Sequence, residues 1–172
     1  MAVFAKVKDF VSVELNEYHR LDEFDCGVPS LNTWLTNQAA RARVSGTAKT
    51  YVWIGTRTDR VFAYYAITPH LVSRHEVSGG MAGGVSVIPA YLLARLALDQ
   101  SLQGQGLGGE LLHDALTRII EASDIASGRL VVVDAIDDQA VSFYRKYGFQ
   151  AVRDNPRRLV IKIATVRQAL GK

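Results

Sequence analysis

Residues 103–109, Gln-Gly-Gln-Gly-Leu-Gly-Gly, carry the strongest structural signal in this chain. They follow an apolar run from Tyr91 to Leu98 and open an apolar-periodic run that begins at Leu107. Strand, glycine loop and helix in this order are typical of a phosphate-binding site. Glycines let the backbone come close to a ligand, and the first helical turn has unpaired N–H groups that the helix dipole favours for anions. The stretch therefore predicts a phosphorylated cofactor.

Length and composition favour one globular domain over residues 1–172. Hydrophobic residues make up 48% of the chain and charged residues 22%, and no apolar run approaches the ~20 residues needed to cross a bilayer, so we expect no membrane span. The 1 cysteine excludes an internal disulfide and fits the cytoplasm. A net charge of +3 permits a nucleic-acid partner without requiring one.

Hydrophobic patterning predicts a mixed α/β chain with an antiparallel start and a parallel pair joined by the helix after the glycine loop. Pro29 starts a helix that runs to about Val44, and Asp137 or Asp138 caps a later helix that ends at Gly148. The glycine-rich segment 78–84 is expected to be a mobile surface loop, because no helix follows it. Strands are predicted at residues 10–15, 51–55, 61–68, 88–98, 130–133 and 159–163.

Two familiar glycine loops do not fit. A Walker A loop needs Gly-Lys-Ser/Thr, and Gly109-Glu110 stands there instead. Gly104, Gly106 and Gly109 satisfy the bare dinucleotide pattern Gly-x-Gly-x-x-Gly. However, that loop belongs near the start of a dinucleotide fold, and here it lies past mid-chain with one further βα unit after it. Position therefore speaks against NAD.

The pattern Gln/Arg-x-x-Gly-x-Gly/Ala is met by Gln103, Gly106 and Gly108, and with it the chain resembles the GNAT acyltransferase superfamily. Residues 94–99 look like the central strand of that family, and residues 140–149 look like its helix before the final strands. The resemblance implies a single domain whose mixed sheet contains two splayed parallel strands, here 92–98 and 130–135. Acetyl-CoA, the acetyl donor, would lie between them.

The same resemblance implies the roles of individual residues. Backbone groups of β-strand residues would pair with the pantetheine arm, and the amides of the glycine loop would hold the pyrophosphate. The implied cofactor-binding residues are Leu96, Ala97, Leu98, Gln103, Gly104, Gln105, Gly106, Leu107, Gly108 and Gly109. Tyr144 would be the general acid, because a phenol with a pKa near ~10 stays protonated at neutral pH and can protonate a leaving thiolate.

A general base is not identified by the sequence. Glu76, Asp99 and Asp134 are carboxylates near the relevant segments, and each is an ordinary capping or solvated group by default. An α-amino group, with a pKa of roughly 7.7–8.0, needs no dedicated base, which favours an α-amine substrate. Cys26 is expected to be a small buried thiol. No Cys/His cluster has metal-ligand spacing, so we expect no metal.

A narrower resemblance, to the TacT-type toxins of the GNAT superfamily, extends through residues 24–27, 31–35, 50–52 and 63–66. It implies acetylation of the α-amino group of aminoacyl-tRNA, a ribbon-helix-helix antitoxin and a homodimer. Asn32 replaces a more usual Asp and Ala63 a frequent Gly, and neither lies in the cofactor motif. The alternatives are a GNAT enzyme for a small-molecule or protein amine and a silent acyl-CoA-binding module.

Basic residues fit a tRNA substrate through sequence-independent phosphate contacts. They gather in two segments: Arg41, Arg43 and Lys49, then Arg153, Arg157, Arg158 and Lys162. Arg95 differs, since it lies inside the predicted central strand. Two roles stay open for it: a buried ion pair with a carboxylate, or substrate binding through the anionic end of a tRNA.

Overall fold

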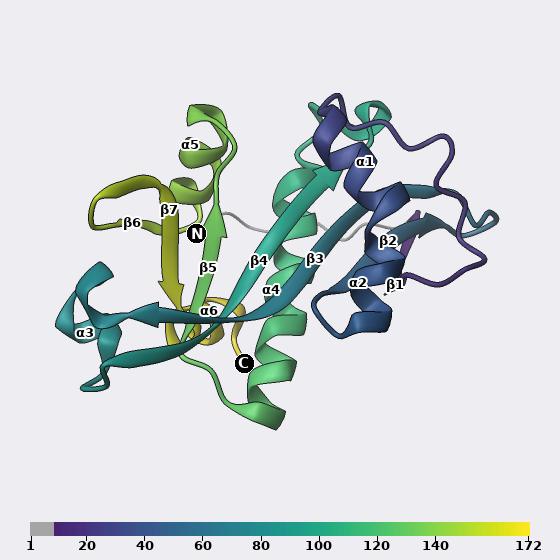
Figure 1. Cartoon of the computed structure of the whole chain (residues 1–172). Coiled ribbons are helices and arrows are strands. Elements are labelled where there is room, and N and C mark those ends of the chain that lie inside the picture. Colours follow the sequence, from purple (N-terminus) through teal and green to yellow (C-terminus); the bar gives the residue numbers. More distant parts are fainter. Residues whose placement is uncertain (1–8) are drawn as a thin grey trace. The chain divides into compact units, whose positions relative to one another are not determined.

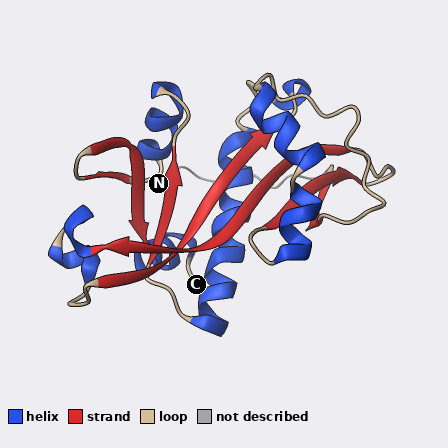
Figure 2. Ribbon diagram, in the orientation of Figure 1, coloured by secondary structure: helices blue, strands red, loops and turns tan. Residues whose placement is uncertain are grey.

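The computed structural model describes residues 9–172 (Figures 1 and 2). The strands form one mixed sheet in the order β1-β2-β3-β4-β5-β7-β6. The chain is divided into two compact units, and each unit takes residues from separate parts of the sequence. We call residues 9–68 with 94–115 the N-terminal unit and residues 69–93 with 116–172 the C-terminal unit. The prediction of one domain over 1–172 stays a prediction.

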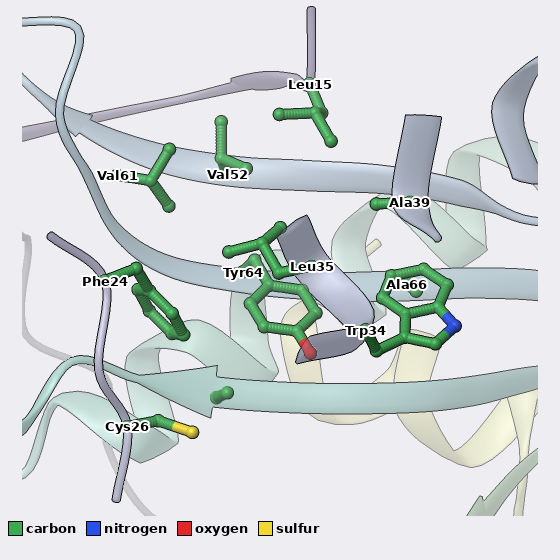
Figure 3. Close-up of a cluster of buried hydrophobic side chains, with 11 residues drawn as sticks. Leu15, Phe24, Cys26, Trp34, Leu35, Ala39, Val52, Val61, Tyr64 and Ala66 are labelled. Atoms are coloured by element: carbon green, nitrogen blue, oxygen red, sulfur yellow. The ribbon is translucent and has the colours of Figure 1, made fainter. Parts of the chain in front are cut away.

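The N-terminal unit is built on the antiparallel strands β1 (Phe10–Glu14), β2 (Lys49–Gly55) and the first part of β3 (Val61–Ser73). Helices α1 (Pro29–Asn37) and α2 (Ala39–Ser45) cover one face of these strands. In the core beneath the helices, the Trp34 and Tyr64 rings stack with their centroids 6.0 Å apart (Figure 3). The predicted antiparallel start is confirmed.

The long helix α4 (Leu107–Ala126) covers the opposite face of the N-terminal unit with its first turns. One carboxylate oxygen of Asp114 on α4 accepts hydrogen bonds from Ser12 on β1, Trp53 on β2 and Tyr65 on β3. Because side chains alternate along a strand, Tyr64 and Tyr65 point to opposite faces of the sheet. The α1/α2 face and the α4 face are therefore distinct.

In the C-terminal unit, β4 (Val87–Leu98) runs parallel to β5 (Leu130–Asp134), as predicted. Helix α5 (Asp138–Lys146) follows, and Asp137 caps it by accepting the Ala140 N–H at 2.8 Å. Strands β6 (Gln150–Val152) and β7 (Asn155–Lys162) then form an antiparallel pair, with β7 against β5. Helix α6 (Ile163–Leu170) ends the described chain and buries Ile163 and Val166.

Three sequence-based expectations were wrong in detail. The helix predicted from Pro29 to Val44 is broken at Gln38, whose φ of −124° is not helical. The segment expected to be a mobile loop contains the short helix α3 (Gly79–Ala82), which begins at the Ser78 cap. Arg129 donates hydrogen bonds to the carbonyls of Gly80 and Met81, so the segment is fixed by a residue distant in sequence. Strand β6 and helix α6 were missed.

Two short 3₁₀ helices complete the described elements: η1 (Arg74–Glu76) and η2 (Gln100–Leu102). Over residues 9–172, none of the helices combines the length and the apolar character that crossing a bilayer would require.

Candidate active site

The end of β4 offers backbone groups to a ligand. β4 pairs with β5 only from Ala90↔Leu130 to Leu93↔Val133, and over the described chain residues 94–98 have no register partner in β5. Backbone N–H and C=O groups without a strand partner cost free energy unless water or a ligand binds them. Leu96, Ala97 and Leu98, the residues expected to contact the pantetheine arm, all lie in this segment.

The glycine loop leads from β4 through η2 into the start of α4. Gly104 and Gly106 have φ values of +77° and +78°, in the left-handed region that favours glycine. A Cβ added at either position would meet no heavy atom within 4 Å, so the loop borders open space. Residues 107–109 form the first turn of α4, whose N–H groups have no intrahelical acceptor. Open glycine backbone followed by a 20-residue helix fits a pyrophosphate.

Side chains of the loop hold it in place. The amide nitrogen Nε2 of Gln103 donates to the carbonyls of Cys26 and Leu98, both at 2.9 Å. Gln105 Nε2 donates to the Ser101 carbonyl at 3.0 Å. The Gln103 side chain therefore ties the cofactor loop to β4 and to the segment before α1, which leaves its backbone for ligand binding.

Asp99 stabilises the segment that leads into the glycine loop. Its side chain is buried and accepts hydrogen bonds from the Asp25 N–H at 3.0 Å and from the Ser101 N–H and hydroxyl at 3.0 and 2.7 Å. Burial raises the pKa of Asp99, but these hydrogen bonds and the Arg60 guanidinium outweigh it, so the pKa is lowered overall. An ionised carboxylate with every oxygen engaged anchors the loop and is unsuited to be a base.

The other two candidate bases are also engaged. Glu76 caps η1 by accepting the Ser73 N–H at 2.8 Å. Asp134 forms a two-pronged ion pair with Arg158, with distances of 2.8 and 2.9 Å. Arg158 also lies 3.5 Å from Nε2 of His70. Each of the three carboxylates proposed from the sequence therefore has a structural partner.

Tyr144 lies on α5 in the C-terminal unit, where it is buried among aromatic rings. Its ring centroid is 5.2 Å from that of Phe143 and 5.5 Å from that of Phe149. Burial strongly raises the pKa of the phenol, so the hydroxyl holds its proton at neutral pH. The side chain therefore meets one requirement of a general acid. Arg95 and the residues expected to bind the cofactor belong to the N-terminal unit.

Arg95 lies over Trp34, with its guanidinium carbon 4.3 Å from the ring centroid. Among residues 9–172 no carboxylate is within ion-pairing distance of its guanidinium, and the guanidinium donates no hydrogen bond. Burial lowers the pKa of Arg95. Of the two roles that the sequence left open for Arg95, the ion pair with a carboxylate is therefore not found among residues 9–172. Trp34, which the sequence presents as a core residue of a helix, is the neighbour that the sequence could not reveal.

Several other residues named from the sequence have structural partners. Arg43 donates to the Leu15 carbonyl at 3.2 Å, and Lys49 lies 3.6 Å from Glu14. Arg157 lies 3.6 Å from Asp138. Cys26 is buried, and burial raises the pKa of its thiol, which agrees with the expected inert thiol.

The chain is similar to known acetyltransferases. The family described as acetyltransferase (GNAT) domain matches residues 27–163. A tRNA-acetylating toxin of Mycobacterium tuberculosis is 32% identical over 149 residues, which cover 86% of this chain and 89% of that protein.

Solved structures of similar proteins include AtaT complexed with acetyl-methionyl-tRNAfMet, with a TM-score of 0.86, 27% identity, and coverage of 94% of this chain and 99% of that one. A second is a mutant AtaT toxin bound to the C-terminus of the antitoxin AtaR and acetyl-CoA, with a TM-score of 0.82, 26% identity, and coverage of 96% and 100%. The predicted fold class is confirmed, and acetyl-CoA is a ligand of this second structure.

Proposed function

Since this chain belongs to the GNAT acetyltransferase family, we propose that it transfers the acetyl group of acetyl-CoA to the α-amino group of aminoacyl-tRNA, as the toxin of a toxin–antitoxin pair. The observation that carries the substrate class is the 32% identity with a tRNA-acetylating toxin over 86% of the chain. Support comes from AtaT, whose structure with acetyl-methionyl-tRNAfMet aligns with 94% of this chain. The acetyl group would otherwise go to a small-molecule or protein amine.

The acetyl donor would be held by the open backbone of the N-terminal unit. Leu96 and Leu98 have no register partner in β5, so their backbone groups would pair with the amides of the pantetheine arm, beside the hydrogen bond that the Leu98 carbonyl accepts from Gln103 Nε2. Amides of residues 103–109 would hold the pyrophosphate, since the loop glycines border open space. Acetyl-CoA supplies a thioester activated toward an amine. A strand N–H near Leu98 would stabilise the oxyanion that forms as the amine attacks.

Tyr144 would act as the general acid. As the new C–N bond forms and the C–S bond breaks, the leaving sulfur needs a proton, and the phenol can deliver one. Burial raises the pKa of Tyr144, so its proton is present over the whole physiological range and available for transfer.

Deprotonation of the attacking amine would need no carboxylate of this chain. The three candidates, Glu76, Asp99 and Asp134, are held by backbone or arginine partners. An α-amino group with a pKa of roughly 7.7–8.0 is already partly neutral near pH 7.5. Water can take the proton that the amine loses on acetylation. A mechanism without a dedicated base suits an α-amine better than a lysine side chain.

Charge distribution supports a nucleic-acid substrate. The C-terminal unit contains eleven Lys and Arg residues and seven Asp and Glu residues. The other unit, counted over residues 4–68 and 94–115, contains nine Lys and Arg residues and ten Asp and Glu residues. The positive surplus of the chain thus lies in the unit that carries Tyr144. Phosphate contacts of this kind add affinity without sequence preference.

The partners follow from the same proposal. AtaT binds the C-terminus of its antitoxin AtaR. For this chain we propose a ribbon-helix-helix antitoxin, a homodimeric toxin, and a cytoplasmic place of action, where aminoacyl-tRNA is found. A neighbouring small gene for a ribbon-helix-helix protein and the mass of the purified protein in solution test the first two.

The experiment that tests the function is transfer of labelled acetyl from acetyl-CoA to a pool of charged tRNA. Uncharged tRNA and the Tyr144→Phe variant are the negative controls. Tyr91→Phe is a matched hydroxyl control, because its phenol donates to the Ser127 carbonyl at 2.6 Å and lies outside the proposed site. We expect label on charged tRNA alone, lost in Tyr144→Phe and kept in Tyr91→Phe. Acetyl-CoA binding without label on any tRNA would point to a small-molecule or protein amine.

A further inference from the structure

Arg95 stands apart from the other half-buried arginines of residues 9–172. Arg60 lies over the Phe62 ring at 4.5 Å in the same way, but it also has Glu23 at 3.5 Å and Asp99 at 3.9 Å. Three other half-buried arginines have ion-pair or hydrogen-bond partners, namely Arg129, Arg158 and Arg167, and Arg118 also has an interaction partner. Arg95 has a ring beneath it and no acceptor.

A half-buried guanidinium without a hydrogen-bond acceptor lowers the stability of the fold. It has five N–H donors and no acceptor capacity, and burial removes part of the water that would otherwise satisfy them. Trp34 compensates for part of the charge through its ring face and holds the guanidinium plane, but it leaves the N–H edges unused. This geometry is suited to an anion that arrives from outside the chain, and planar donor pairs match phosphate oxygens.

The position of Arg95 separates it from the cofactor loop. Ala97, two residues later on β4, packs in the core cluster of Trp34 and Tyr64, and Arg95 itself lies over Trp34, so Arg95 points to the α1/α2 face. The glycine loop leads into α4, which covers the opposite face through Asp114. The anion that meets Arg95 is therefore distinct from the pyrophosphate that the glycine loop is suited to hold.

We propose that Arg95, oriented by Trp34, binds a phosphodiester of the 3′-terminal nucleotides of aminoacyl-tRNA and so selects an amine that is attached to RNA. This inference rests on the proposed function. In aminoacyl-tRNA the carboxyl group of the amino acid is esterified, so the anions nearest the reacting amine are the phosphodiesters of the RNA end. A free amino acid, by contrast, would offer its own carboxylate to the same guanidinium.

The first test measures binding of uncharged tRNA by fluorescence anisotropy over a series of salt concentrations, so that it needs no turnover. Arg95→Met keeps the apolar stem over Trp34 and removes the charge, and Arg95→Lys keeps the charge without the planar fork. Arg57→Met is the charge-matched control, from an exposed turn of the same unit. For Arg95→Met we expect roughly tenfold weaker binding and a salt slope lower by about 0.7–1, as for the loss of one phosphate contact.

The other variants separate the effect of the charge from that of the planar guanidinium. Arg95→Lys should lose affinity several-fold and keep the salt slope, while Arg57→Met should stay within about twofold of wild type. Acetyl-CoA affinity should be unchanged in Arg95→Met. Its thermal stability should be equal or higher, because an unmatched, partly desolvated charge has been removed. A wild-type affinity and salt slope in Arg95→Met would overturn the proposal, as would a loss confined to acetyl-CoA binding.

A second test separates this inference from the proposed function. Acetylation is measured with aminoacyl-tRNA and with the corresponding free amino acid as acceptors. If Arg95→Met raises KM for aminoacyl-tRNA and leaves the KM for acetyl-CoA unchanged, the inference is supported. If the wild type acetylates aminoacyl-tRNA and Arg95→Met does so equally well, the inference fails and the function stands. If free amino acids are the acceptors and depend on Arg95, the anion is their carboxylate, and both proposals fail.

Discussion

Replacing Gly106 by alanine separates the backbone strain of the cofactor loop from its role in binding. Gly106 has a φ of +78°, and a Cβ there meets nothing within 4 Å. Gly46, at the end of α2, has a φ of +72° and equally open surroundings. The two positions are therefore matched in strain and in space, and only Gly106 lies in the proposed phosphate cradle.

The expected stability loss is the same at both sites. Forcing an alanine into the left-handed region costs about 1–2 kcal/mol, and the stiffer unfolded chain returns about 0.4–1 kcal/mol, so each variant should lose about 1 kcal/mol. Acetyl-CoA binding should differ. A methyl group in the cradle would displace the phosphate from one charge-assisted hydrogen bond worth about 1.5–3 kcal/mol, which corresponds to roughly 10- to 100-fold in Kd.

Urea denaturation gives the free energy of unfolding, and isothermal titration calorimetry gives the Kd for acetyl-CoA. We expect Gly46→Ala to bind acetyl-CoA like the wild type and Gly106→Ala to bind it much more weakly at equal stability. If both variants bind equally well, the loop does not hold the cofactor phosphates. If both lose affinity in proportion to stability, the effect is strain alone.

Three further predictions concern the buried or hydrogen-bonded side chains of Asp114, Asp99 and Cys26. Asp114→Ala leaves the three donors from β1, β2 and β3 without their common acceptor. Urea denaturation should show that the free energy of unfolding falls by about 3 kcal/mol, at about 1 kcal/mol per donor. A fall below about 1 kcal/mol would mean that water replaces the carboxylate. The pKa of Asp99 is lowered in the folded protein, so its stabilising contribution is present above the unfolded pKa of about 3.9 and is lost as pH falls through the folded value. In Asp99→Asn the free energy of unfolding should therefore fall less steeply as pH decreases below about 3.9. An unchanged pH dependence contradicts this prediction. The Cys26 thiol has a raised pKa, so alkylation of the folded protein at pH 7.5 should be much slower than that of a free thiol, and rapid labelling would contradict its inert role.

Where the prediction from sequence succeeded, the signal was local. The strand before the glycine loop and the start of α4 at Leu107 depend on neighbouring residues alone. The same is true of the Asp137 cap of α5. Backbone conformation at such places is set by residue type within a few positions, which makes it readable without a structure.

Where the prediction failed, a distant contact decided. The glycine-rich segment 78–84 has the composition of a loop, yet Arg129 binds two carbonyls of its short helix. Helix α6 has a brief apolar pattern that becomes a helix because Ile163 and Val166 are buried against the rest of the chain. Neither contact leaves a trace in the local sequence.

The sequence alone determined the glycine loop before α4, the family resemblance and the parallel strand pair, because residue types that allow few backbone conformations fix the local structure. The tertiary structure decided which charged side chains are available. Glu76, Asp99 and Asp134 look alike as candidate bases in the sequence, and each one is withdrawn by a partner. Arg95, for which the sequence leaves two roles open, lies over the aromatic ring of Trp34 and not beside a carboxylate. The chemistry of a charge depends on what lies within a few ångströms of it, and only the folded chain determines those neighbours.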